Sequence, residues 1–90
     1  MITVKEAVKA AMTSVADVFS GQSPIGLRVE EVDCSEDDTT WHVTVSFVPG
    51  ALPGAAAASM GFSSEGREYK TVTLRASDGK VQSLKIRQLA

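Results

Sequence analysis

The segment from Thr40 to Pro49 alternates apolar and polar side chains. Its apolar positions are Trp41, Val43, Val45 and Phe47, and the positions between them are His42, Thr44 and Ser46. A period of two is typical of a β-strand with one buried face, because successive side chains point to opposite sides of a sheet. The pattern therefore predicts a half-buried strand with one apolar face and one hydroxyl-rich face.

The first twenty residues follow a helical spacing instead. Apolar side chains recur every three or four residues, at Val4, Val8, Ala11, Met12, Val15, Val18 and Phe19, which is the pattern of an amphipathic helix. Thr3 and Glu6 form a capping box, in which each side chain accepts a hydrogen bond from the other residue's backbone N–H. We expect a helix that begins at Val4 and ends at Gly21 in the left-handed conformation.

Three further strands are predicted. They cover Leu27–Val32, Tyr69–Ala76 and Val81–Leu89, with a hairpin loop at Ser35–Thr39 and a tight turn at Ser77–Gly79. Within the first of these strands, Glu30 and Glu31 separate Val29 from Val32, and this spacing suggests a bulge or an early twist.

Residues 49–66 break every pattern and predict a long irregular loop, or one short helical turn at Ala55–Met60. Leu52, Met60 and Phe62 are the large apolar residues of this loop that concern function. They either fold back and close one end of the sheet, or offer an adaptable docking surface, for which methionine and phenylalanine are suited.

These elements predict an α+β fold: one N-terminal helix on a four-stranded antiparallel meander, forming a single domain over residues 1–90. The expected core consists of Val8, Met12, Val15, Phe19, Val29, Trp41, Val43, Val45, Phe47, Val72, Leu74, Leu84 and Ile86. The opposite sheet face is expected to carry His42, Thr44, Ser46, Thr71, Thr73, Lys85 and Arg87, with no covering element from this chain.

Charge is distributed unevenly. Residues 1–48 hold three basic and eight acidic groups, a balance of −5, and residues 49–90 hold six basic and three acidic groups, a balance of +3. The acidic run from Glu30 to Asp38 and the scattered cations argue against nucleic-acid binding. No window is apolar enough for a membrane span, and the sequence does not begin with a secretion signal. We expect a cytoplasmic protein.

No residue pattern predicts catalysis, a cofactor or a metal site. His42 is the only histidine and Cys34 the only cysteine, too few for a transition-metal site. The acidic residues lack calcium-loop spacing, and no phosphate-binding glycine motif occurs. Cys34 is either a turn-proximal cysteine or a reactive thiol, although acidic neighbours raise a thiol pKa.

Two segments resemble known families. The sequence G-R-E-Y-K-T-V-T-L-R-A-S-D-G-K-V-Q-S-L at 66–84 resembles the closing hairpin of PepSY-like domains. The sequence V-E-E-V-D-C-S-E-D-D-T-T-W-H-V-T-V at 29–45 is similar to a segment of gas-vesicle accessory protein O. The resemblance implies a non-enzymatic interaction module: an inhibitor or binder of other proteins in the first case, and an assembly factor in the second.

We therefore expect a small non-catalytic module, of bacterial or phage origin, that binds another protein as an accessory factor or inhibitor. The expected partner-binding residues are Leu52, Met60, Phe62, His42, Thr44, Ser46, Tyr69, Thr71, Lys85 and Arg87. Simple solvation of the uncovered sheet face is the alternative, and a homodimer could form through this face or an edge strand. A different class is a small-molecule binder with a cavity beside Ala7, Ala11 and Ala16, gated by the 49–66 loop. A minimal enzyme using His42 or Tyr69 is a third.

Overall fold

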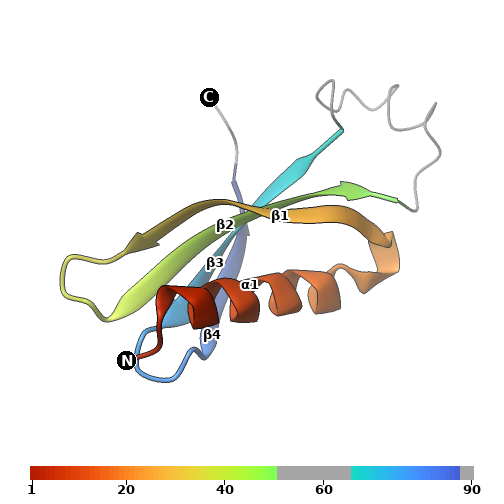
Figure 1. Cartoon of the computed structure of the whole chain (residues 1–90). Coiled ribbons are helices and arrows are strands. Elements are labelled where there is room, and N and C mark those ends of the chain that lie inside the picture. Colours follow the sequence, from red (N-terminus) through yellow and green to blue (C-terminus); the bar gives the residue numbers. More distant parts are fainter. Residues whose placement is uncertain (51–65, 88–90) are drawn as a thin grey trace.

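One helix and four antiparallel strands make up the described part of the chain. The computed structural model describes residues 1–50 and 66–87. Its elements are α1 (Val4–Val18), a 3-10 turn η1 (Ser20–Gln22), β1 (Pro24–Cys34), β2 (Thr40–Pro49), β3 (Glu68–Arg75) and β4 (Val81–Ile86). The strands pair in the order β1-β2-β3-β4, and α1 crosses one face of the sheet (Figure 1). The predicted α+β fold is confirmed.

The ends of α1 differ in how well the sequence predicts them. The capping box is present: Thr3 N donates to Glu6 Oε1 at 2.9 Å, and Glu6 N donates to Thr3 Oγ1 at 3.1 Å. The predicted end is wrong. The helix stops at Val18 and continues as η1, where Gly21 lies, and the left-handed residue is Ser23, with φ +48°.

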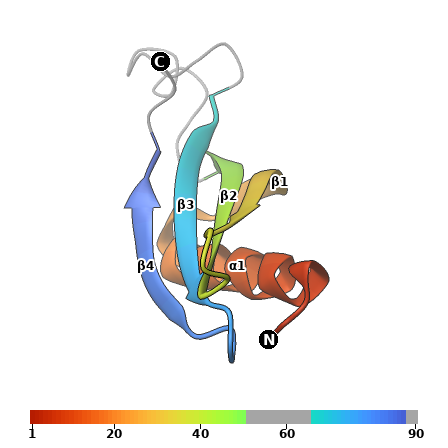
Figure 2. The same cartoon turned by 90° about the vertical axis from the view of Figure 1, so that its left-hand side faces the viewer.

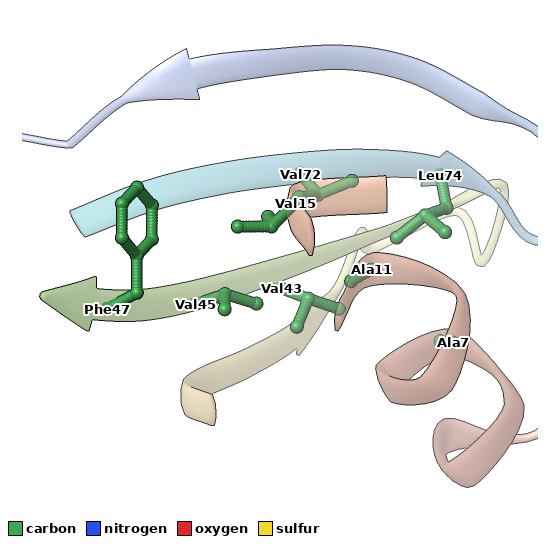
Figure 3. Packing of buried hydrophobic residues seen from close by; sticks show 8 residues of the cluster. All are labelled: Ala7, Ala11, Val15, Val43, Val45, Phe47, Val72 and Leu74. Carbon is green, nitrogen blue, oxygen red and sulfur yellow. The ribbon is translucent and has the colours of Figure 1, made fainter. Parts of the chain in front are cut away.

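A stripe of small side chains joins α1 to the sheet. Ala7, Ala11 and Val15, spaced four residues apart, are completely buried. They pack on the fully buried Val43, Val45, Phe47, Val72 and Leu74 of β2 and β3 (Figure 3). The alanines let the helix approach the sheet closely, so that Val8 and Met12 lie half-buried on its flank. Val4 and Val18 are exposed, although their spacing suggested a place on the buried face.

Two residues of the helix-facing sheet side depart from the expected core. Ile86 is 74% exposed because β4 is the outermost strand, and its assignment to the core was wrong. Lys70, its partner in the register, is buried instead. The Lys70 ammonium lies 3.1 Å from Glu68 Oε1 and 4.8 Å from the centre of the Phe19 ring. An ion pair and a cation–π contact thus compensate for burial of this charge.

The bulge predicted between Val29 and Val32 is present and has a consequence for both glutamates. The β1–β2 register shifts between Val29 and Glu31. In a regular strand Glu30 and Glu31 would point to opposite faces. The extra residue lets both side chains reach polar groups on the far side of the sheet from α1.

The turn between β3 and β4 also fastens the start of the chain. Gly79 has φ +76°, a conformation that favours glycine. Arg75 forms a two-nitrogen ion pair with Asp78 across the turn. Ile2 N donates to Ala76 O at 2.7 Å, which holds the residues before α1 against this hairpin.

Candidate functional site

The sheet face away from α1, here called the open face, gathers polar side chains of β2, β3 and β4. Its strand positions include His42, Thr44, Ser46, Tyr69, Thr71, Thr73, Ser83 and Lys85. The register places His42 beside Thr73, Thr44 beside Thr71 and Ser46 beside Tyr69. Figure 2 shows β3 passing in front of part of α1, and the described residues contain no further α-helix or strand that could cover the open face.

A charged cluster covers the middle of this face at Ser46. The Ser46 hydroxyl donates to Glu30 Oε2 at 2.9 Å and accepts from Arg67 Nε at 3.0 Å. Arg67 Nη2 also donates to the carbonyls of Ser46, at 3.2 Å, and of Gly26. Ser46 is 0% exposed, so the hydroxyl is occupied within the fold.

The hydrogen bonds of this cluster keep Glu30 ionised. Its pKa is lowered first by the hydrogen bond from Ser46 and next by the hydrogen bond from Arg28, whose Nε lies 3.0 Å from Glu30 Oε2. A carboxylate that accepts such bonds is favoured in its charged form. The cluster therefore has a fixed negative group beside two guanidinium groups at neutral pH.

A second cluster ties the last described residue of the chain to the first strand. Arg87 Nη2 lies 2.7 Å from Glu31 Oε2, and Arg87 Nη1 lies 3.2 Å from Thr44 Oγ1. Thr44 Oγ1 is also 3.4 Å from Thr71 Oγ1. The two charged side chains remain 39% and 50% exposed, whereas Thr44 is buried. The centre of the open face is thus internally paired, and its rim meets solvent.

His42 lies at the end of this polar row. It is half-buried rather than exposed, and its Nδ1 is 3.3 Å from Thr73 Oγ1. No group of three or more histidine, cysteine, aspartate or glutamate side chains that could hold a metal ion occurs among the described residues. The His42 ring therefore contacts Thr73 of the neighbouring strand β3.

The acidic loop between β1 and β2 uses its carboxylates to build a turn. Asp37 Oδ1 accepts from Ser35 Oγ and Thr39 Oγ1, both at 2.7 Å, and from Thr39 N at 3.2 Å. These bonds lower the pKa of Asp37. Burial raises the pKa of the Cys34 thiol, and the nearby charge of Asp38 raises it further. The raised pKa opposes the reactive-thiol interpretation.

The two edges of the sheet are unlike. β1 has register shifts at two places, and Gly26 has φ +65°. β4 has one irregularity, at its start beside Leu74, and is regular from Ser83 to Ile86. Lys85 is exposed, and its side chain has no hydrogen-bond or ion-pair partner within residues 1–50 and 66–87.

The remaining candidates are three apolar residues of the 49–66 loop and the small side chains of α1. Leu52, Met60 and Phe62 lie outside the described residues. Of the small helix residues expected beside a ligand cavity, Ala7 and Ala11 are completely buried against the sheet and Ala16 is half-buried. A hollow of about 560 Å³ lies instead along an exposed flank of α1, between Glu6 and Asp17.

The sequence-based choice of residues missed charged members of both clusters, among them Glu30, Glu31 and Arg67. The break in alternation at Val29–Val32 was the signal for the two glutamates, because a bulge changes which face a side chain meets. Arg67 lies before β3, outside any periodic segment, so no pattern marked it.

Comparison with protein families, with curated proteins and with solved structures finds no match to this chain. The resemblance to PepSY-like domains and to gas-vesicle accessory protein O stays a prediction. None of the described helices has the length and apolar character needed to cross a membrane.

Proposed function

We propose that this chain is a small non-catalytic module that binds another protein in the cytoplasm and acts as an accessory factor or an inhibitor. The observation that carries the proposal is the pair of clusters on the open face. Arg67 with Glu30 and Arg87 with Glu31 hold charged groups of both signs in defined positions around buried hydroxyls.

Such a surface suits protein recognition for two physical reasons. Side chains already held by hydrogen bonds lose less freedom when a partner docks. An ordered arrangement of both signs discriminates between partners, because a wrong arrangement places like charges together. The phenol of Tyr69, half-buried beside Ser46, adds an aromatic group of the kind enriched in interfaces.

A photocrosslinking amino acid tests which face meets the partner. Ser83 lies half-buried on the open face, and Lys9 lies exposed on α1, so the two sites are a matched pair in the same chain. We expect the crosslinker at Ser83, in extracts of the source cells, to give a defined protein adduct that excess unlabelled chain abolishes. The Lys9 variant should give none.

Two results would count against the proposal. Equal amounts of adduct from Ser83 and Lys9 would mean that the partner does not prefer the open face over the exposed side of α1. If the Ser83 variant gives no adduct that excess unlabelled chain abolishes, the open face is merely solvated. Light scattering of the pure chain distinguishes self-association through this face or an edge strand from binding of a different protein.

A further inference from the structure

Within the described residues, no strand pairs with the outer edge of β4, whose backbone groups follow a regular order. Arg87 N donates to Tyr69 O at 2.9 Å, and Lys85 and Ser83 face Thr71 and Thr73 in the same register. In an antiparallel ladder, hydrogen-bonded pairs alternate with pairs whose backbone groups point the other way. The N–H and C=O groups of Leu84 and Ile86 therefore point away from β3.

Figure 2 shows β4 at the edge of the sheet, with no described strand beyond it. The opposite edge is less suited to pairing. Two register shifts interrupt β1, and the carbonyl of Gly26 already accepts from Arg67 Nη2. Bulges of this kind protect a sheet edge from pairing with another chain.

The charge and the exposed apolar area of β4 indicate which side chains a partner segment would carry. Residues 80–87 contain Lys80, Lys85 and Arg87 and no acidic residue. Arg87 is paired with Glu31, whereas the Lys85 side chain has no partner in the described ranges. Ile86, 74% exposed on the helix-facing side, adds apolar area on the other face of the same strand.

We propose that β4 accepts an acidic, extended segment of the partner protein as a fifth antiparallel strand. This inference rests on the proposed function and names the partner's chemistry. The partner residue opposite Lys85 would occupy a pair whose side chains lie closest together, and it is acidic. The residues opposite Leu84 and Ile86 are apolar. A second copy of this chain suits the edge less well, because its own β4 brings the same cations.

Lysine on an edge strand also protects natural sheets from unwanted pairing. Fluorescence anisotropy distinguishes this protective role of Lys85 from the recognition of an acidic strand. The probes are a labelled peptide that alternates glutamate with valine and its lysine–valine counterpart. We expect saturable binding of the acidic peptide only. Lys85→Glu should weaken that binding about fivefold and favour the basic peptide.

A second pair of variants tests the backbone contact. Ile86→Pro removes one outward N–H, a substitution that an edge position tolerates, while Ile86→Ala removes the side chain and keeps the N–H. We expect Ile86→Pro to bind about fivefold more weakly than Ile86→Ala. Circular dichroism checks that both variants fold, and Lys85→Glu keeps the test decisive where Ile86→Pro does not fold.

Several outcomes would overturn strand addition at β4. These are no saturable binding of the acidic peptide, equal binding of both peptides, or equal affinity of the two Ile86 variants. A dimer that protects the Leu84 and Ile86 amides from hydrogen exchange would assign the edge to a second copy. A competed adduct at Ser83 together with any of these results would leave the proposed function standing and remove only this inference.

Discussion

Replacing Arg67 with methionine tests whether the open-face cluster stabilises the fold. The substitution keeps most of the aliphatic length and removes the guanidinium, which donates to Ser46 Oγ at 3.0 Å, to Ser46 O at 3.2 Å and to Gly26 O. Hydrogen bonds from charged donors contribute about 1.5–3 kcal/mol each. Water replaces part of them at this half-buried site, so we expect a loss of about 2 kcal/mol.

Urea denaturation followed by the fluorescence of Trp41, the only tryptophan, measures this loss directly. In a domain of this size it corresponds to a fall in Tm of about 8–16 °C. Lys85→Met is the matched control, because Lys85 is a cationic side chain on the same face without a partner in the described residues. A change below about 0.5 kcal/mol for Arg67→Met, or an equal change for Lys85→Met, would refute a stabilising role.

Four further predictions concern the core, a helix cap and two ionisable groups. Phe47→Ala, at a 0% exposed position, should lower the free energy of unfolding by about 3–5 kcal/mol, measured by thermal melting; a loss under about 1 kcal/mol would contradict the packing. Thr3→Ala should cost about 1 kcal/mol, whereas the exposed Thr13→Ala should be nearly neutral. The hydrogen bond from Arg75 and then that from Lys80 N lower the pKa of Asp78 in the folded state. The stabilisation that ionised Asp78 provides should therefore be fully present above the ordinary pKa of aspartate and should be lost as the pH falls below that value. Asp78→Asn should reduce this pH dependence of the free energy of unfolding, measured by acid denaturation. Cys34, with its raised pKa, should react more slowly with iodoacetamide at pH 8 than a free cysteine does.

The sequence predicts the sheet well because its signals are local. Alternation from Trp41 to Phe47 specifies which side chains face α1, and the Val29–Val32 spacing marks a real bulge. The capping box likewise depends on two residues three positions apart. Each of these features needs no knowledge of distant contacts.

The errors arise where distant packing decides. Periodicity could not show that Ala7 and Ala11, rather than larger neighbours, approach the sheet most closely. It placed Ile86 in the core because it could not show that β4 is an edge strand on which Ile86 is exposed. The ion pair of Arg87 with Glu31 joins residues far apart in sequence. Local sequence patterns therefore did not predict the charged clusters on the open face.

The most direct test of the central claim is amide hydrogen exchange of the chain, measured with and without the partner protein that the Ser83 crosslinker identifies. The claim is that the side of the sheet opposite α1, with its β4 edge, meets the partner. It predicts slower exchange of amides in β3 and β4 on binding, including those of Leu84 and Ile86, and unchanged exchange in Val4–Val18. Protection confined to α1, with β3 and β4 unchanged, would contradict it.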